Sequence, residues 1–206
     1  MNRLIIVGAS GHGKVVADIA IRNGYKDIVF LDDDDIAECA GLPVVGKTNS
    51  MNSNRWIGDD FVVAIGDARA RERIQSEIPG RVVTLIHPDA CISARAKIGE
   101  GSVVMAGAVI NSDSIIGRGC IVNTGATIDH DCSVGDFVHV SVGAHVAGTV
   151  RIGDRTWIGI GSIVSNNVDV CCDCVIGAGA VVVSDIASSG TYIGLPAKRL
   201  RGGSGI

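Results

Sequence analysis

Three histidines lie close together in the sequence, at positions 130, 139 and 145. Histidine is the side chain whose ordinary pKa falls nearest to neutral pH, so it often serves as an acid or a base in active sites. His130 differs from the other two because it lies between two carboxylates, Asp129 and Asp131. A carboxylate beside an imidazole fixes the tautomer of the ring and raises its basicity. The sequence therefore predicts that His130 is a general base.

A six-residue repeat decides where these histidines lie. From Ile92 to Val182 every sixth residue is Ile or Val, and the residue two places before each is small or Val. Neither an α-helix nor one long strand has this period, but a short strand followed by a corner, three times per turn of a prism, does. Because residues two apart on a strand share a face, both positions are predicted to point inward. The stretch from Ile92 to Val182 would form five complete coils of eighteen residues in a parallel β-helix.

The repeat also indicates where each histidine side chain points. His130 falls at a corner, two places after the inward Ile128. His139 and His145 each stand one place before an inward valine and are predicted to point outward from consecutive faces of one coil. None of the three is predicted to lie in the core. For His145 a solvated surface residue is the alternative interpretation.

The neighbours of His130 support a role for it as a base. One coil away along the prism lie Ser112 and Gly148, and their small size predicts room for a substrate beside the imidazole. Cys132 follows closely but occupies an inward position, where a thiol acts as a compact apolar side chain. We therefore expect direct attack by an acceptor molecule with help from His130, and no covalent Cys/His mechanism.

The seven cysteines are predicted to be reduced thiols. Cys120 and Cys174 share the inward position of Cys132. Cys171 and Cys174 form a C-x-x-C, a spacing found in zinc sites. Cys171 is expected outside the prism or at a corner, however, while Cys174 points inward. No metal site is expected.

The residues before the repeat alternate between strand and helix patterns, which predicts an α/β domain at 1–86 and an all-β domain with a C-terminal tail at 87–206. The expected elements are a strand at 3–8, a helix at 15–21, strands at 27–32 and 61–65, a helix at about 68–78 and a strand at 81–86 that closes the sheet.

A glycine turn in this first domain predicts a ligand. Gly8, Gly11 and Gly13 lie between the first strand and the first helix, but their spacing is not that of the dinucleotide fingerprint. Glycines allow the backbone to approach a ligand, and a helix N-terminus attracts phosphate, so a nucleotide or nucleotide sugar is expected rather than NAD. The alternative is a tight turn without a ligand. Ligands of open sheets bind at the carboxyl ends of strands, which here are followed by Ser10, Gly11, His12, Asp32, Asp33 and Gly66.

The overall composition excludes several classes of protein. A net charge of −4 gives no support to a nucleic-acid surface. No apolar run reaches the length of a membrane span, and no basic leader with a cleavage site precedes the first strand. A cytoplasmic location without membrane insertion is therefore expected.

These segments resemble one known family. The repeat, residues 123–132 and 135–141, and the tail at 194–198 are similar to the bacterial sugar O- and N-acyltransferases, a group that includes sialic acid O-acetyltransferases. Residues 8–13 and 30–33 resemble the same family. The combination is most similar to the UDP-4-amino-sugar N-acetyltransferases of the bacillosamine pathway.

The resemblance implies a fold, a reaction and an assembly. It implies a Rossmann-like nucleotide-sugar-binding domain before a left-handed parallel β-helix. It also implies acetyl-CoA as the acetyl donor, a nucleotide-linked amino sugar such as a UDP-4-amino-4,6-dideoxy sugar as the acceptor, and a homotrimer with active sites between subunits.

The resemblance assigns roles to residues as well. His130 would be the catalytic base, and Asp131 would orient its ring, although Asp stands where relatives have Glu. Contacts to the nucleotide sugar would come from the six residues at the strand ends of the first domain. By charge alone, Lys198 and Arg199 could meet the phosphates of CoA, and a solvated tail is the alternative. The contacts to acetyl-CoA would come from His139, Gly148, Ile160 and Ala178.

Two other functions stay open at this point. The same base could activate a sugar hydroxyl, which would make the protein an O-acetyltransferase. The chain could also keep the β-helix as a scaffold without catalysis.

Overall fold

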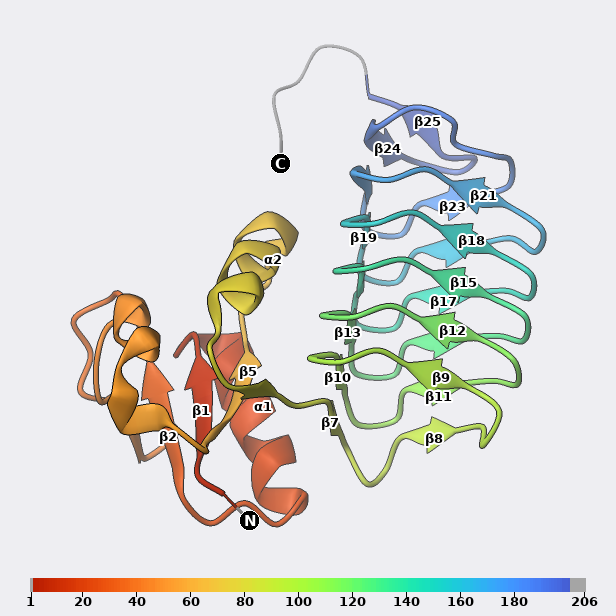
Figure 1. Cartoon of the computed structure of the whole chain (residues 1–206). Coiled ribbons are helices and arrows are strands. Elements are labelled where there is room, and N and C mark those ends of the chain that lie inside the picture. Colours follow the sequence, from red (N-terminus) through yellow and green to blue (C-terminus); the bar gives the residue numbers. More distant parts are fainter. Residues whose placement is uncertain (1, 201–206) are drawn as a thin grey trace.

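The computed structural model describes residues 2–200 and consists of an α/β domain followed by a parallel β-helix (Figure 1). The elements of the first domain are β1 (Leu4–Val7), α1 (Gly11–Arg22), β2 (Ile28–Leu31), β3 (Glu38–Cys39), β4 (Leu42–Pro43), the 3-10 helices η1 (Thr48–Asn52) and η2 (Asn54–Trp56), β5 (Asp60–Val63), α2 (Ala68–Glu77) and β6 (Arg81–Val82).

The first domain is built around a four-stranded parallel sheet in the order β2-β1-β5-β6. Strands β1, β2 and β5 are buried along their whole length, as expected of a parallel sheet covered on both faces. Helix α1 packs on the face that carries Ile6 and Phe30. The 3-10 helices and α2 cover the other face, which carries Ile5 and Phe61.

The β-helix has three faces, which we name by their strands. The first face contains β7 (Leu85–Ile86), β10 (Val103–Val104), β13 (Ile121–Val122), β16 (His139–Val140), β19 (Trp157–Ile158), β22 (Cys174–Ile176), β24 (Gly190–Ile193) and the antiparallel β25 (Lys198–Arg199). The second face contains β8 (Cys91–Ile92), β11 (Val109–Ile110), β14 (Thr127–Ile128), β17 (His145–Val146), β20 (Ile163–Val164) and β23 (Val181–Val182). The third face contains β9 (Lys97–Ile98), β12 (Ile115–Ile116), β15 (Ser133–Val134), β18 (Arg151–Ile152) and β21 (Asp169–Val170).

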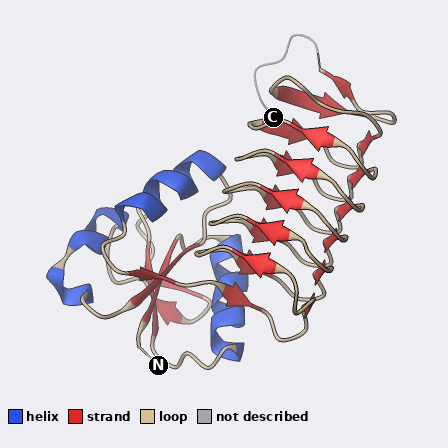
Figure 2. Cartoon of the chain, turned by 45° about the vertical axis from the view of Figure 1, so that its right-hand side comes forward, coloured by secondary structure: helices blue, strands red, loops and turns tan. Residues whose placement is uncertain are grey.

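The predicted parallel β-helix is confirmed. The inward Ile and Val positions stack in register, so that Val122 pairs with Val140 and Ile128 with Val146. Every such position from Val104 onward is buried. Figure 2 shows these short strands rising in parallel ladders beside the helices of the first domain.

The expected strand at 81–86 is not a single element, and this prediction was wrong. Residues Arg81–Val82 form β6 and pair with β5 in the first sheet. Residues Leu85–Ile86 form β7 and pair with β10 in the β-helix. The segment divides because the Val83 amide still donates to the carbonyl of Phe61, whereas the Leu85 amide donates to that of Ser102. Helix α1 also begins at Gly11, before the expected start at residue 15.

The two domains share a hydrophobic core. Leu85, Val103, Met105 and Ile121 of the first face are buried in the same cluster as the apolar side of α1 and the sheet residues beneath it. The first domain therefore packs on the first face, and the outward residues Leu85, Val103 and Ile121 of that face are buried rather than solvated.

The cysteines follow the repeat, with one detail that the spacing did not predict. Cys120, Cys132 and Cys174 are buried. Cys171 lies where β21 gives way to a corner, but it is half-buried, and its Sγ lies 3.4 Å from Sγ of Cys174. Across residues 2–200, no three His, Cys, Asp or Glu side chains come together in a way that could hold a metal ion. In the same range, no helix has both the length and the apolar character needed to cross a membrane.

Candidate active site

His130 lies on the edge between the second and third faces, in the turn that joins β14 to β15. Its Nδ1 lies 2.8 Å from Oδ2 of Asp131. Asp131 has a left-handed backbone, with φ of 58°, as do Asp113 and Thr149 at the same corner of neighbouring coils. This conformation brings the short aspartate side chain into direct contact with the ring beside it.

The contact with Asp131 is the largest cause of a raised pKa of His130, and the negative charge of Asp129 adds to it. When Nδ1 carries the proton and donates a hydrogen bond to Asp131, Nε2 is the ring nitrogen that can accept a proton. Asp129 is held in turn, because its Oδ1 accepts hydrogen bonds from the His130 amide and from Nδ2 of Asn111, both at 2.8 Å. The dyad thus has the arrangement of a histidine base with an orienting carboxylate.

A titration tests this arrangement. The imidazole of His130, followed by NMR, is expected to titrate with a pKa above the ordinary value of histidine, and the ring is free to accept a proton only above that raised pKa. In Asp131→Asn the raising contact is lost and the pKa should fall. Asp113→Asn, at the equivalent position one coil away, is the matched control and should leave the titration of His130 unchanged. An unshifted titration in Asp131→Asn would contradict the dyad.

Gly148 lies directly against the His130 ring. A Cβ atom built on Gly148 would lie 2.7 Å from both Cε1 and Nε2 of His130. We expected open space for a substrate between His130 and Gly148. The His130 ring itself occupies that space, because Gly148 has no side chain and the ring packs directly on its backbone.

His139 differs from its predicted environment. It points outward from the prism, as expected from the repeat, but the first domain covers it. Its ring is stacked on the indole of Trp157 with centroids 6.0 Å apart. Burial, followed by the charges of Arg71 and His12, lowers the pKa of His139 to about 3. His139 is therefore a neutral, half-buried imidazole, whereas His145 is exposed and contacts Thr127 through Nδ1 at 2.9 Å.

The six predicted nucleotide-sugar residues gather at one edge of the first sheet. Ser10 and Gly11 follow β1, Asp32 and Asp33 follow β2, and Gly66 follows β5. Strands β2 and β5 lie on opposite sides of β1, so the order in which strands are added to the sheet reverses at β1. Ligands of open α/β sheets bind at such a switch point.

The N-terminus of α1 lacks a side-chain cap. The Ser10 side chain makes no capping hydrogen bond. Gly13 allows close packing, since a Cβ there would meet the carbonyl oxygen of Gly8. His12 lies in the first turn of α1. Burial, followed by the charge of Arg71, lowers the pKa of His12 to about 4. Its buried Nε2 has no hydrogen-bond partner among residues 2–200.

The two aspartates already have backbone partners. Oδ2 of Asp32 accepts a hydrogen bond from the amide of Ala9 at 2.5 Å, and Oδ1 accepts one from the amide of Asp34. Oδ1 of Asp33 accepts one from the amide of Thr48 at 2.9 Å. Asp32 thereby ties the end of β2 to the glycine turn, and both aspartates shape the loops as well as offering oxygens.

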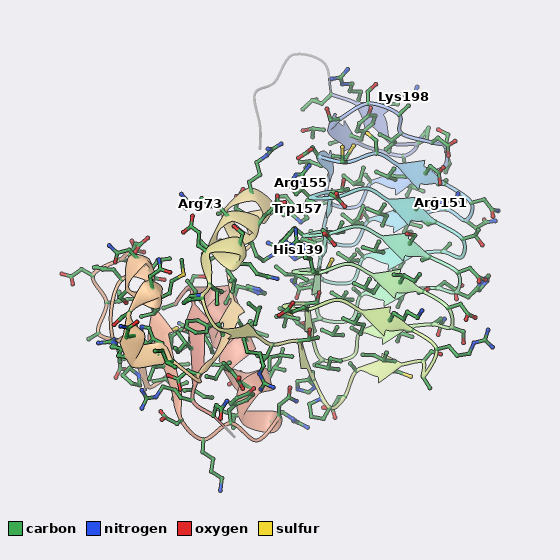
Figure 3. The ribbon with its side chains drawn as sticks, in the orientation of Figure 1. Arg73, His139, Arg151, Arg155, Trp157 and Lys198 are labelled. Atoms are coloured by element: carbon green, nitrogen blue, oxygen red, sulfur yellow. The ribbon has the colours of Figure 1, made fainter. Side chains whose placement is uncertain are left out.

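A cavity of about 520 Å³ lies between α2 and the first face. Gly66 and the first turn of α2 form one wall, and His139, Trp157 and Val175 form the other. Figure 3 shows His139, Trp157 and Arg155 on the side of the β-helix that faces α2. Arg155 binds both carboxylate oxygens of Asp173 at 3.0 Å, and Arg69 of α2 also contacts Asp173, at 2.6 Å, so charged pairs close the rim.

The predicted acetyl-CoA residues do not form one cluster within a single chain. Ile160 and Ala178 stack one coil apart on the edge between the first and second faces, and both are exposed. Gly148 lies on the edge between the second and third faces, and His139 lies within the first face. His130 likewise lies on the edge opposite the first face, away from the first domain.

Arg71 and Trp157 belong to this region but were not predicted from the sequence. Arg71 is buried beneath the end of β5 and contacts the β-helix. A signal existed: Arg71 is three residues before Ile74 on α2, so it occupies the apolar side of that helix. Trp157 is in the outward column of the first face, and the sequence alone did not show what covers that face.

Comparison with known proteins agrees with this architecture. Residues 3–78 match the family model of the PglD N-terminal domain, and residues 95–130 match that of the bacterial transferase hexapeptide, six repeats. The acetyltransferase domain of PglB from Neisseria gonorrhoeae is 45% identical, with 97% of this chain and 100% of that chain covered and a TM-score of 0.94. A structure of that domain holds acetyl coenzyme A.

Two further relatives are a protein solved with a sugar nucleotide and a sugar N-acetyltransferase. PerB from Caulobacter crescentus, solved with CoA and GDP-perosamine, is 38% identical with a TM-score of 0.93, covering 97% of this chain and 98% of its own. The UDP-N-acetylbacillosamine N-acetyltransferase of Bacillus subtilis is 33% identical over 113 residues. This match spans about half of each protein, 52% of this chain and 52% of the relative.

The chain belongs to the family of bacterial sugar N-acetyltransferases in which a PglD N-terminal domain precedes a hexapeptide β-helix. Its relatives in this family bind acetyl-CoA or CoA as the acyl-group carrier.

Proposed function

We propose that this protein transfers the acetyl group of acetyl-CoA to the amino group of a nucleotide-linked amino sugar, with a UDP-4-amino-4,6-dideoxy sugar as the first candidate. The observation that carries the proposal is the dyad of His130 and Asp131, with its 2.8 Å contact and an Nε2 that is free to accept a proton. The sugar-binding part of the proposal rests on the six residues at the strand ends of the first domain.

The dyad supports direct transfer. Nε2 of His130 takes a proton from the sugar amine as its nitrogen attacks the thioester carbonyl carbon and the C–N bond forms. Asp131 stabilises the imidazolium that results. When the C–S bond of the tetrahedral adduct breaks, the CoA thiolate leaves, and the proton on His130 can pass to its sulfur. The imidazole is then neutral again.

We further propose a homotrimer with active sites between subunits. The first domain packs on the first face, whereas His130 is on the opposite edge, so the sugar site and the base of one chain are apart. A neighbouring copy that presents its His130 edge would unite them. In such a groove Ile160, Ala178, Gly148 and His139 would contact acetyl-CoA, while Lys198 and Arg199 would meet its phosphates.

The family resemblance supports three finer assignments within this proposal. These are a Rossmann-like first domain at 1–86, a left-handed β-helix domain at 87–206 and a cytoplasmic location. The sugar hydroxyl stays the alternative acceptor.

The proposal is tested by measuring thiol release from acetyl-CoA against a panel of UDP- and GDP-linked 3-amino and 4-amino sugars and a sialic acid. We expect release with at least one nucleotide-linked amino sugar and N-acetylated product by mass spectrometry. Light scattering should give three times the mass of one chain. Thiol release with the hydroxyl acceptor alone would show that the protein is an O-acetyltransferase and not an N-acetyltransferase. No release with any acceptor would favour a non-catalytic scaffold.

A further inference from the structure

Arg71 of α2 is only 1% exposed, although arginine is almost never fully buried unless its charge is paired. Its hydrogen-bond partners are all backbone carbonyls. Nη1 donates to Ile65 at 2.7 Å and to Gly66 at 2.9 Å, Nε donates to Gly119 at 2.7 Å, and Nη2 donates to Phe137 at 2.7 Å. Every nitrogen of the guanidinium is used.

These carbonyls come from both domains. Ile65 and Gly66 follow β5 in the first domain, whereas Gly119 and Phe137 are corner residues of successive coils of the β-helix. The guanidinium is flat and rigid, so it fixes the distances between the carbonyls that it joins. An ammonium group on a flexible stem cannot make this set of bonds in one plane.

The charge of Arg71 also acts on two imidazoles. Burial lowers the pKa of Arg71 to about 10, so it is still a cation at neutral pH. After burial, its charge is the next cause of the low pKa values of His12 and His139. The Asn123 side chain is oriented by its Oδ1, which accepts from the Thr124 amide, so its Nδ2 donates to Nε2 of His139 at 3.1 Å. His139 is thus held neutral with its proton on Nδ1.

We propose that Arg71 is a positioning residue, which holds Gly66 and the nucleotide-sugar site of the first domain at a fixed place relative to the β-helix face that carries His139. The inference rests on the proposed function, because it assumes that the sugar nucleotide binds at the end of β5 and that acetyl transfer occurs beside the β-helix. Arg71 itself is enclosed by the carbonyls and touches neither substrate.

The test compares Arg71→Lys and Arg71→Met with Arg73→Met in the full chain. Arg73 is on the same helix, is exposed, and lies on the side that faces away from the β-helix (Figure 3). With acetyl-CoA and the UDP-4-amino-4,6-dideoxy sugar, Arg71→Lys is expected to raise the KM for the nucleotide sugar and lower kcat, together about 10- to 100-fold in kcat/KM. The KM for acetyl-CoA should stay within about twofold, and Arg73→Met should match the wild type.

Two readouts do not depend on activity. In Arg71→Met the pKa of His139, followed by NMR, should rise toward 6.5, and in Arg71→Lys the peptide covering residues 64–70 should exchange its amide hydrogens about tenfold faster or more. An Arg71→Lys protein that melts earlier but keeps wild-type kinetics and wild-type exchange in that peptide would reduce Arg71 to a stabilising residue and overturn the inference. If the wild type releases no CoA with any sugar nucleotide, the proposed function fails, and the amide exchange of residues 64–70 still decides whether Arg71 holds Gly66.

Discussion

Replacement of His130 by alanine is expected to lower kcat for acetyl transfer by about 10²- to 10⁴-fold, the usual contribution of a positioned general base. The side chain is 57% exposed and makes its contact with Asp131 at the surface of a corner, so its loss should leave the stacked core unchanged. The melting temperature should therefore stay close to that of the wild type. Steady-state release of CoA thiol measures the first quantity and calorimetry the second.

His145→Ala is the matched control for this experiment. His145 is also an exposed histidine of the β-helix, on the adjacent strand β17. It lacks a carboxylate partner among the described residues, since Nδ1 contacts the hydroxyl of Thr127. Wild-type kcat is expected for His145→Ala. If His130→Ala kept full activity as well, the base would have to be another group, and the dyad would have no catalytic role.

Gly148→Ala is expected to have an effect almost as large, although it removes no catalytic side chain. The added methyl group would lie 2.7 Å from Nε2 of His130, so the ring must swing away from its place on Gly148. The ring is exposed and can move at little cost in stability, and the backbone of Gly148 is not left-handed. We therefore expect kcat to fall by about 10²-fold, as for a base displaced by about 1 Å, while the melting temperature changes little.

Asn166→Ala provides the comparison for Gly148→Ala. Asn166 is exposed and lies at the same corner, one coil beyond Gly148 and two coils beyond His130. Its replacement should leave kcat unchanged. A Gly148→Ala protein with wild-type kcat would show that the ring does not rest on Gly148 during the reaction. A large drop in melting temperature would instead show that the corner backbone shifts in place of the ring.

The repeat predicted most of the β-helix because each coil repeats the same local physics. Inward Ile and Val residues such as Val140 and Ile128 can be read from spacing alone, and the structure confirms them as buried. The corner position of His130 follows from the same count. Asp131 was predicted to orient the ring, but the sequence did not show that its short side chain reaches the ring directly, because that contact depends on the left-handed backbone of Asp131.

Long-range packing explains what the sequence did not reveal about the site. The repeat showed that His139 points away from the prism, but not that the first face is covered by another domain. Whether an outward residue is solvated depends on where the chain enters the β-helix, and no local pattern encodes that. Arg71 was missed for the same reason, since two of the carbonyls that accept its hydrogen bonds come from residues 48 and 66 positions away in the sequence.

The divided strand at 81–86 has a consequence for how the two halves of the chain can be separated. Only Val83 and Thr84 lie between β6 and β7, so the last strand of one sheet leads almost directly into the first strand of the other. Val103, Met105 and Ile121 would become an apolar surface if the preceding residues were removed. The β-helix is thus not an independent module, because its first coils bury apolar side chains against the first domain. A boundary drawn in the sequence is not a boundary in the core.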